Sequence, residues 1–328
     1  MIKELLDNNI TEANQWHKKR EDIKKRLYET IGTPPVERNT CNLEIVGEEH
    51  FKKYVRRKIC YTVGDNDVIW AYLLIPRKIN APAPAIVAMH QTVDSGKNEV
   101  VGTDGNPDYA YGDELATRGY IVIAPDYLTA GERIYPDKEG FESGPFYEKY
   151  PDWSMVGKNM EDSMAAVDVL YTLDCTDYER IGVIGHSHGG HNAMFAAAVD
   201  ERIQVCVSNC GMSVFSEEEC RLEWALEEGY IYIPALRKYF LEDREPPFDI
   251  HEVASLIAPR PFLNISSYFD EAYGNQEFLA EVGVQLYNVY KLYGRQNHFS
   301  YFMHGNDHSF PLCARSLAYE WLDWFLKA

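Results

Sequence analysis

Short apolar runs alternate with amphipathic stretches along most of the chain. Residues 85–89 are apolar at every position, which is typical of a strand buried on both faces. Further strands are predicted at 120–124, 181–184, 205–208, 262–266 and 299–303. Helical spacing predicts helices at 109–118, 159–173, 190–199, 276–292 and 312–326. This alternation predicts an α/β fold, with a mainly parallel central sheet and helices on both faces.

The first 48 residues follow a different pattern. Residues 11–31 form a polar helical pattern, with Thr11 as a possible N-cap, and Gly32 followed by two prolines should end the helix. The β-rich runs 54–63 and 68–75 flank a turn-forming segment, which predicts a hairpin. We therefore expect an N-terminal helical extension (1–48) and one catalytic α/β domain (49–328).

Two long stretches interrupt the strand–helix rhythm. Residues 127–153 are rich in glycine, proline and aromatic side chains, and residues 212–251 are acidic and aromatic. Insertions of this length in a compact domain usually carry function. Both follow strand ends on the side where open α/β sheets place their sites, so we expect them to form the substrate pocket.

Charge and cysteine usage narrow the functional classes. The formal net charge of −19 argues against nucleic acid or an anionic membrane as a partner, because a polyanion would be repelled. We expect no membrane-spanning segment, and the N-terminus lacks the long apolar run of a secretory signal. Seven scattered cysteines without C-x-x-C spacing predict reduced thiols and a cytoplasmic location, whereas the oligomeric state is not readable.

The most informative motif is a serine between two glycines at the end of a predicted strand. Gly185-His186-Ser187-His188-Gly189 follows the strand 181–184 and precedes a helix rich in small residues. Glycines two positions before and after the serine permit the tight turn of a nucleophile elbow. We expect Ser187 to be exposed at a helix N-terminus, where backbone N–H groups can stabilise developing negative charge.

A serine nucleophile needs a base and an acid that orients the base. In this strand–turn–helix context the chain order is serine, then acid, then histidine. Asp270 follows the strand 262–266, and His308 follows the strand 299–303. We expect these two to complete the triad. The rivals are Glu271 for the acid, and His304 and His298 for the base. His304 should be the less free of these to reach the serine, because it lies on or near the strand.

The oxyanion hole should combine two backbone N–H groups. One belongs to His188, the residue after the nucleophile, and the other to Gln91 or Thr92, in the loop after the strand 85–89. The sequence does not choose between these two residues.

Other residues are weaker candidates for the substrate pocket. They are polar residues near strand ends and aromatic residues of the insertions: His90, Asp126, Arg133, Trp153, Trp224 and Tyr230. For Asp126 and Arg133 a loop-fixing salt bridge is the competing interpretation, and for the aromatics a small core of their own. His186, His188 and His191 lack metal-site spacing, so we expect packing roles for them and neither a metal nor another cofactor.

From about residue 50 onward the chain resembles the α/β-hydrolase superfamily. The elbow around Ser187, the acid Asp270 and the base His308 match its motif positions. The segments His90-Gln91-Thr92, 120–126 and 131–133 are similar to the branch of dienelactone hydrolases and acetyl xylan esterases, although dienelactone hydrolases carry a cysteine where this chain has serine. The resemblance implies cofactor-free hydrolysis of a small-molecule ester through an acyl-enzyme.

We therefore interpret the chain as a serine carboxylesterase. A serine peptidase or amidase of the prolyl-oligopeptidase type shares the elbow and the order of the triad, but it usually carries a propeller domain for which residues 1–50 are too short. A thioesterase would form the same acyl-enzyme. The non-enzymatic alternative is a catalytically silent binding protein with the hydrolase fold.

Overall fold

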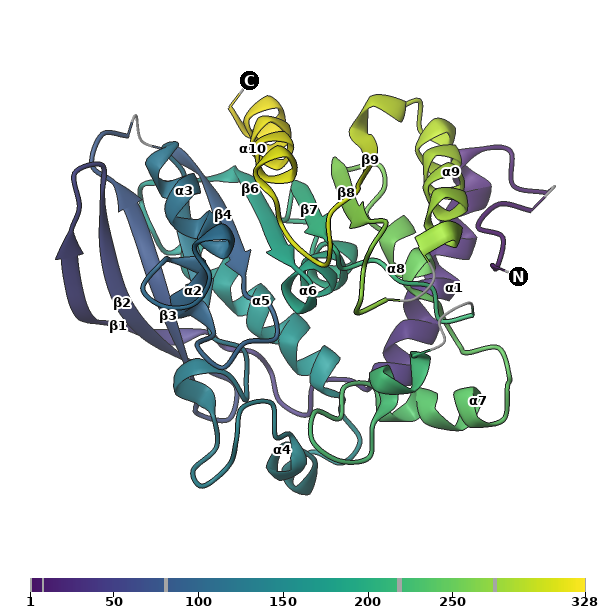
Figure 1. Cartoon of the computed structure of the whole chain (residues 1–328), viewed down its shortest axis with the longest axis horizontal. Coiled ribbons are helices and arrows are strands. Elements are labelled where there is room, and N and C mark those ends of the chain that lie inside the picture. The colour runs from purple at the N-terminus through teal and green to yellow at the C-terminus, as the bar shows by residue number, and fades with distance from the viewer. Residues whose placement is uncertain (1, 8, 80–81, 217–219, 274–275, 328) are drawn as a thin grey trace.

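Nine strands form one sheet in the part of the chain that the computed structural model describes, which is residues 2–7, 9–79, 82–216, 220–273 and 276–327 (Figure 1). The strand order is β1-β2-β3-β5-β4-β6-β7-β8-β9. The strands are β1 (Cys41–His50), β2 (Tyr54–Val63), β3 (Asp67–Pro76), β4 (Ala83–Met89), β5 (Ile121–Pro125), β6 (Thr176–His186), β7 (Val205–Asn209), β8 (Phe262–Ser267) and β9 (Phe299–His304).

The sheet is antiparallel at one end and parallel over the rest. Strands β1, β2, β3 and β5 pair antiparallel, and β2 and β3 form the predicted hairpin, in which Val63 is opposite Asp67. Strands β5, β4, β6, β7, β8 and β9 pair parallel in that order. The prediction of a mainly parallel sheet is confirmed. Because parallel strands share a direction, the carboxyl ends of these six strands meet at one edge.

Helices cover both faces of the sheet (Figure 1). Helices α2, α3 and α10 pack on one face, and α1, α5, α6, α8 and α9 pack on the other. The helices are α1 (Ala13–Ile31), α2 (Lys97–Val100), α3 (Tyr111–Thr117), α4 (Gly144–Lys149), α5 (Met155–Tyr171), α6 (His188–Val199), α7 (Arg237–Leu241), α8 (Ile250–Ser255), α9 (Gln276–Leu292) and α10 (Leu312–Leu326).

The unbroken apolarity of β4 follows from this two-sided burial. Ile86 and Ala88 pack toward α3 and α10, whereas Ala85, Val87 and Met89 pack toward α5 and α6. Successive side chains of a strand point to opposite faces, so both sets must be apolar when both faces are covered.

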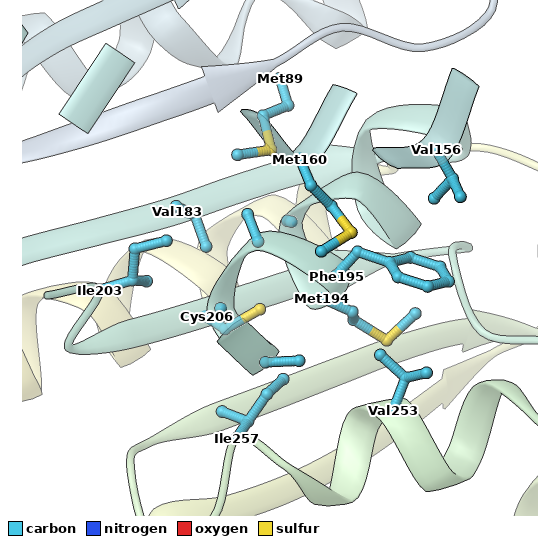
Figure 2. Packing of buried hydrophobic residues seen from close by; sticks show 14 of the residues in the cluster. Met89, Val156, Met160, Val183, Met194, Phe195, Ile203, Cys206, Val253 and Ile257 are labelled. Carbon is cyan, nitrogen blue, oxygen red and sulfur yellow. The ribbon is translucent and has the colours of Figure 1, made fainter. Parts of the chain in front are cut away.

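In the part of the chain that the structure describes, buried hydrophobic residues form two clusters, one on each face of the sheet. Side chains from β4, β6, α5, α6 and α8 pack together in the larger of these two cores (Figure 2). Met89 and Val183 come from the sheet, Met160 from α5, Phe195 from α6 and Val253 from α8, and each is at most 2% exposed. Burying a side chain of this kind contributes about 1.5–3 kcal/mol. This core fixes α5 and α6 against the carboxyl half of the sheet.

Four helices (α1, α3, α5 and α6) begin at other residues than the sequence predicts, and the capping residues explain the difference for α1 and α5. Helix α1 begins at Ala13 and its N-cap is Glu12, so the expected Thr11 cap is wrong. The side-chain oxygen of Gln15 accepts hydrogen bonds from the backbone N–H groups of both Thr11 and Glu12. Helix α5 begins at Met155, four residues earlier than predicted, because Ser154 caps it by accepting the N–H of Gly157.

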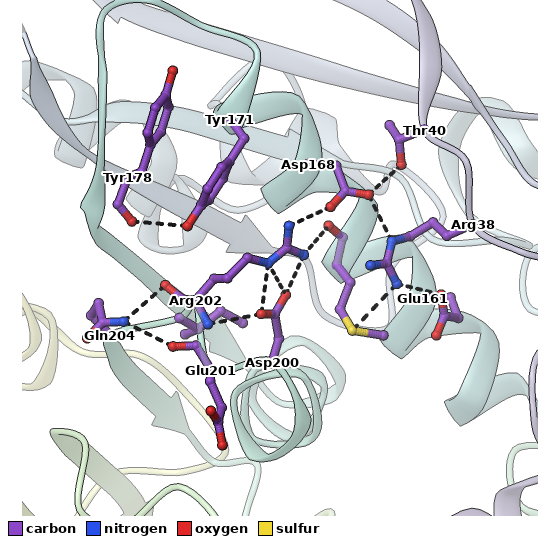
Figure 3. A network of polar contacts seen from close by, with 12 residues as sticks. Arg38, Thr40, Glu161, Asp168, Tyr171, Tyr178, Asp200, Glu201, Arg202 and Gln204 are labelled. Carbon is purple, nitrogen blue, oxygen red and sulfur yellow. Dashed lines mark hydrogen bonds and ion pairs between the residues drawn. The ribbon is translucent and has the colours of Figure 1, made fainter.

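The N-terminal segment packs against the rest of the protein. Strand β1, which the sequence analysis did not predict, crosses the expected boundary at residue 48, and α1 buries Trp16, Ile23 and Leu27 in the larger core. The division at residue 48 itself stays a prediction. Figure 3 shows how the stretch before β1 is held. Arg38 forms ion pairs with Glu161 and Asp168 of α5, and Asp168 also pairs with Arg202.

The two insertions contact one another. Ser143 Oγ donates to the carbonyl of Gly229 at 2.8 Å and accepts the N–H of Ile231 at 2.8 Å, and Tyr147 OH donates to the Ile231 carbonyl. Their helices α4 and α7 lie along the lower edge of the molecule in Figure 1. Within the second insertion, residues 217–219 lie outside the described part of the chain.

The cysteines whose side chains the structure describes form no disulfide bonds with one another. Six cysteines carry free thiols: Cys60, Cys175, Cys206, Cys210, Cys220 and Cys313. No helix in the described ranges is both long and apolar enough to cross a membrane.

Candidate active site

The parallel strands bring the three predicted catalytic residues to one edge of the sheet. Ser187 directly follows β6, Asp270 lies three residues after the end of β8, and His308 lies four residues after the end of β9. Strands β6, β7, β8 and β9 are consecutive neighbours in the sheet. Residues far apart in the sequence therefore lie at the carboxyl ends of neighbouring strands, where α/β sheets place their sites.

Ser187 has the backbone of a nucleophile elbow. Its φ of 53° and ψ of −120° are unusual for a residue with a side chain, and its N–H donates to the Asn209 carbonyl at 2.8 Å. The flanking glycines permit the approach of strand and helix that this turn requires. A Cβ atom at Gly185 would lie 2.2 Å from the Gly189 carbonyl, and one at Gly189 would lie 2.0 Å from the Met89 carbonyl oxygen.

The elbow places the serine at the start of α6. Ser187 is the N-cap of this helix and His188 is its first residue. The N–H of His188 is therefore one of the four at a helix N-terminus that have no acceptor within the helix, and the helix dipole there favours negative charge. Such a donor can stabilise an oxyanion formed beside Ser187.

His308 and Asp270 form the hydrogen bond expected of a base and its orienting acid. His308 Nδ1 lies 2.8 Å from Asp270 Oδ1, and the Asp270 side chain is 1% exposed. The same oxygen accepts the backbone N–H groups of Ala272 at 3.0 Å and Tyr273 at 3.2 Å. The rival acid Glu271 is exposed. A proton on Nδ1 donated to Asp270 leaves the Nε2 lone pair available to accept another proton.

The loop that carries His308 is tied to its surroundings. Tyr109 OH donates to the His308 carbonyl at 3.4 Å, and Asn209 Nδ2 donates to the Ser309 carbonyl at 3.0 Å. The rival bases are held elsewhere: His304 ends β9, as expected, and His298 Nδ1 contacts the Pro259 carbonyl. Of the histidines in the described chain, His308 is the one whose ring nitrogen is bonded to Asp270.

The elbow histidines are packed among aromatic rings and amides. Burial lowers the pKa of His186 and His188 well below the usual range, and that of His191 to about 3. His188 Nε2 faces the amide nitrogens of Asn159 and Asn192 and the hydroxyl of Tyr230, at 2.8–3.2 Å. These surroundings favour neutral rings, as a packing role requires.

An aromatic wall runs from His188 to His308. The ring of His191 lies 5.1 Å from that of His188 and 4.9 Å from that of Trp224. The ring of Tyr273 lies 6.1 Å from that of Trp224 and 5.7 Å from that of His308. Trp224 and Tyr230, both expected at the pocket from their place in the second insertion, therefore lie beside elbow residues.

Trp153 has a different environment from the one expected. Its indole packs against Phe146 and Tyr150 of the same insertion, and with them it lines a cavity of about 240 Å³ that also contacts Pro34 and Lys158. Neither Ser187 nor His308 lines this cavity. The pocket role expected for Trp153 is therefore not supported, because the tryptophan packs with its own insertion and the N-terminal segment.

The pocket roles expected for Asp126 and Arg133 are not supported either. Asp126 is fully buried and pairs with Lys97 Nζ at 2.5 Å, and Lys97 also pairs with Glu132. Arg133 pairs with Asp162 and Asp67 at 2.6 Å each. These contacts match the alternative given in the sequence analysis, in which Asp126 and Arg133 fix loops through salt bridges and do not contact substrate. The basic side chains of this cluster outweigh burial and lower the pKa of Asp67 to about 2.

His90 also holds two loops together. It is fully buried, its Nδ1 contacts the carbonyl of Gln91 at 2.7 Å, and its Nε2 accepts the N–H of Tyr127 at 3.1 Å. Both ring nitrogens are thus used to join the loop after β4 to the loop after β5, and the expected substrate contact is not supported. The choice between the Gln91 and Thr92 N–H groups for the oxyanion stays a prediction.

Sequence reasoning missed the contribution of the loop after β7. Asn209 accepts the Ser187 N–H with its carbonyl and holds the His308 loop with its amide, and the next residue is Cys210. Cys210 Sγ, a carboxylate oxygen of Asp270 and a ring nitrogen of His308 all lie within 4.8 Å of one another. The available signal was position, because both residues stand at the carboxyl end of a predicted strand.

Comparison with known proteins shows the family of this chain. The family model described as glucuronyl esterase of fungi matches residues 63–294. YtaP of Bacillus subtilis (strain 168), a protein named as a hydrolase, is 30% identical over 257 residues, which cover 76% of this chain and 81% of YtaP.

Solved structures share the fold over nearly the whole chain. A glucuronoyl esterase from Solibacter usitatus aligns with a TM-score of 0.75 at 20% identity, covering 97% of this chain and 96% of that one. A promiscuous CE15 esterase from a marine bacterial metagenome aligns with a TM-score of 0.75 at 16% identity, covering 99% and 97% of the two chains.

The fold and these matches define a serine carboxylic ester hydrolase of the α/β-hydrolase superfamily. More narrowly, the chain belongs to the glucuronyl esterase family. The superfamily and the esterase class inferred from the sequence are confirmed.

We expect Gly189→Ala to destabilise the protein by about 1–3 kcal/mol or more, because the new Cβ would collide with a backbone oxygen that cannot move independently. The measurement is the free energy of unfolding in urea. Gly144→Ala is the matched control, since no heavy atom lies within 4 Å of the added Cβ. Equal stability of the two variants would show that the elbow tolerates a side chain at position 189.

We expect Arg133→Met to cost about 3–5 kcal/mol of unfolding free energy, because it leaves the fully buried Asp162 without one of its two cations. Arg57→Met is the control. Arg57 pairs with Glu48 where both side chains are about one-third exposed, so water screens the pair and its loss should change the free energy of unfolding little. Losses of similar size in both variants would contradict a structural role for the buried cluster.

Proposed function

We propose that Ser187, His308 and Asp270 form the catalytic triad of this esterase. Ser187 Oγ attacks the carbonyl carbon of the ester, and His308 Nε2 takes the hydroxyl proton. The tetrahedral intermediate collapses with transfer of that proton to the leaving alcohol, which gives an acyl-enzyme. Water then repeats the sequence, with His308 as base, and releases the carboxylic acid.

The observation that carries this proposal is the 2.8 Å hydrogen bond between His308 Nδ1 and Asp270 Oδ1. Because Asp270 is held by two backbone N–H groups, it presents an acceptor to Nδ1 and favours the tautomer whose Nε2 is free. The carboxylate also stabilises the imidazolium that forms when Ser187 loses its proton.

Negative charge on the substrate oxygen would be stabilised at the N-terminus of α6. We assign the backbone N–H of His188 as one donor and that of Gln91 or Thr92 as the other. The buried His90, bonded to the Gln91 carbonyl, supports the second donor by fixing the loop after β4. Removal of one such donor in other enzymes lowers kcat by about 10²–10³.

We further propose that the substrate is a carbohydrate ester, most specifically an ester of a uronic acid. Both the matching family model and the Solibacter structure are named as esterases that act on esters of glucuronic acid. The aromatic side chains between His188 and His308 support a small-molecule pocket here, because such pockets are lined mainly by apolar and aromatic groups. Tyr268 and Phe269, which precede Asp270, are 60% and 70% exposed and offer further surface for the alcohol portion.

The other acyl-transfer reactions remain testable with the same protein. Cleavage of aminoacyl anilides without cleavage of simple esters would favour a peptidase, and faster turnover of acyl thioesters would favour a thioesterase. Failure of a fluorophosphonate to label Ser187 would favour the catalytically silent alternative.

We expect Ser187→Ala to lower kcat for a p-nitrophenyl ester by about 10⁴-fold or more, because it removes the nucleophile. Asp270→Asn should lower kcat by about 10³–10⁴-fold, since an amide no longer selects the required tautomer. Circular dichroism should show that both variants remain folded.

Matched controls test the choice of acid and base. His308→Gln should abolish turnover, whereas His304→Gln, at the end of β9, and Glu271→Gln, beside the acid, should retain most of it. Loss of activity on replacing Glu271, with activity kept in Asp270→Asn, would overturn the assignment of the acid.

We expect Phe269→Ala to raise KM by several-fold for an alkyl or aryl ester of glucuronic acid and to leave KM for p-nitrophenyl acetate nearly unchanged. The physical reason is the loss of exposed aromatic surface beside Asp270. Trp324→Ala is the control, because Trp324 is also 70% exposed but its neighbour Asp323 pairs with Arg118 and Tyr120, before the amino end of β5. Equal effects of the two substitutions on both substrates would contradict the proposed contact.

A further inference from the structure

One thiol next to the catalytic residues has no part in the proposed reaction. Cys210 follows β7 with a φ of 48°, and its N–H donates to the Ile265 carbonyl of β8 at 2.8 Å. The residue is 1% exposed, and its Sγ lies 3.7 Å from the Ser309 carbonyl oxygen. The loop thus holds the thiol between the strand that precedes Asp270 and the residue that follows His308.

The atoms around this thiol form a set of metal ligands. Cys210 Sγ, a carboxylate oxygen of Asp270 and a ring nitrogen of His308 lie within 4.8 Å of one another. In addition, Asp270 Oδ2 is buried and has no partner with hydrogen-bond geometry among the described residues. The Cys210 thiol is the side chain that interacts with this carboxylate, and a cation between the two groups would satisfy the buried oxygen more fully than the weak S–H donor does.

We propose that Cys210, Asp270 and His308 bind Zn²⁺ and that the bound ion reversibly inhibits the esterase. The inhibitory part of this inference rests on the proposed triad, whereas the binding site rests on the three side chains alone.

The donor set selects the class of metal. One thiolate, one imidazole and one carboxylate are ligands that Zn²⁺ accepts, whereas Mg²⁺ and Ca²⁺ require oxygen ligands. The thiolate and the carboxylate together balance the charge of a divalent ion, so the occupied site is neutral. Tetrahedral Zn²⁺ with bonds of about 2.0–2.3 Å places its ligand atoms about 3.4–3.6 Å apart. This separation lies between the 2.8 Å of the His308–Asp270 contact and the 4.8 Å limit of the cluster, so shifts of the side chains would accommodate the ion. A fourth position is left for water.

The ion can reach the site through His308. Its side chain is 18% exposed, whereas those of Asp270 and Cys210 are buried, so the histidine lies on the solvent side of the cluster. Burial raises the pKa of the Cys210 thiol well above the usual range. A coordinated metal ion provides the charge that permits deprotonation, and the thiol proton passes to solvent.

Zinc binding would prevent catalysis through the tautomer of His308. Nδ1 is the nitrogen that contacts Asp270, so it is the one that binds the ion. The Nδ1 proton would pass to solvent and Nε2 would take up a proton from solvent, so the bound ring stays neutral and carries its proton on Nε2. A protonated Nε2 has no lone pair for the Ser187 hydroxyl, and Asp270 is occupied by the metal. Both functions of the acid–base pair are therefore lost while the ion is bound.

Direct binding is tested first, without reference to activity. Purified Ser187→Ala protein, freed of metal, is titrated with ZnCl₂ by calorimetry and with CoCl₂ by absorption spectroscopy. We expect one high-affinity ion per chain and a thiolate-to-cobalt charge-transfer band that Cys210→Ala lacks. Cys206→Ala is the matched control, since Cys206 is also a buried free thiol on β7 and lies outside the cluster. Absence of the band in the parent protein, or its persistence in Cys210→Ala, would overturn the site.

Inhibition is then measured with the wild-type chain and a p-nitrophenyl ester. We expect micromolar Zn²⁺ to abolish turnover, EDTA to restore it, and Mg²⁺ to have no effect. Cys210→Ala should raise the half-inhibitory Zn²⁺ concentration at least tenfold relative to its own uninhibited rate, and Cys206→Ala should not change it. If Cys210→Ala fails to fold, Cys210→Ser gives the same comparison with a weaker ligand. Equal inhibition of the wild type and the Cys210 variant would overturn the proposal. If the wild-type protein were inactive but still bound cobalt through a thiolate, only the proposed triad would be overturned, and the metal site would stand.

Discussion

The site depends on the contact between two backbones, β6 and α6, at the elbow. Because Gly185 has no Cβ atom, the end of β6 lies against the first turn of α6. Because Gly189 has none, the same turn also lies against the end of β4. This contact fixes Ser187 in its unusual backbone conformation and orients the N-terminus of α6. Its position relative to the neighbouring strands then determines where Asp270 and His308 can meet. The larger core, which clamps α5 and α6 to the sheet, keeps the contact closed.

Charged groups behind the site hold the loops rather than bind substrate. Lys97, Asp126 and Glu132 join the loop after β4 to the loop after β5, and Arg133 with Asp162 joins the first insertion to α5. Buried pairs of this kind contribute little net stability compared with apolar packing, but they tolerate few alternative arrangements. They therefore restrict the conformation of the loops after β4 and β5.

The fold could be predicted largely from the sequence, because strands buried on both faces are apolar at every position and elbows require glycines. Ser187, Asp270 and His308 were predictable as a set, since each follows a strand of one parallel sheet. The environments of Trp153, Asp126 and Arg133 were not, because whether a side chain faces substrate or a partner depends on contacts between distant segments. Lys97 carries no local signal, since its buried partner Asp126 lies 29 residues away in the chain. Cys210 has only its position after a predicted strand, because Asp270 and His308 lie at least 60 residues away. Strand β1 was missed because its apolar residues Leu43, Ile45 and Val46 are exposed at the sheet edge.

The hydrogen bonds between Ser143, Gly229 and Ile231 join the two insertions into one structural unit. Tyr230, between the two bonded residues, reaches His188, so the geometry of the elbow side chain is coupled to both insertions. Segments separated by some 80 residues must therefore vary in concert for specificity to change. An attempt to graft the pocket of a relative onto this scaffold would need to transplant both segments together, because either one alone would meet a foreign counterpart.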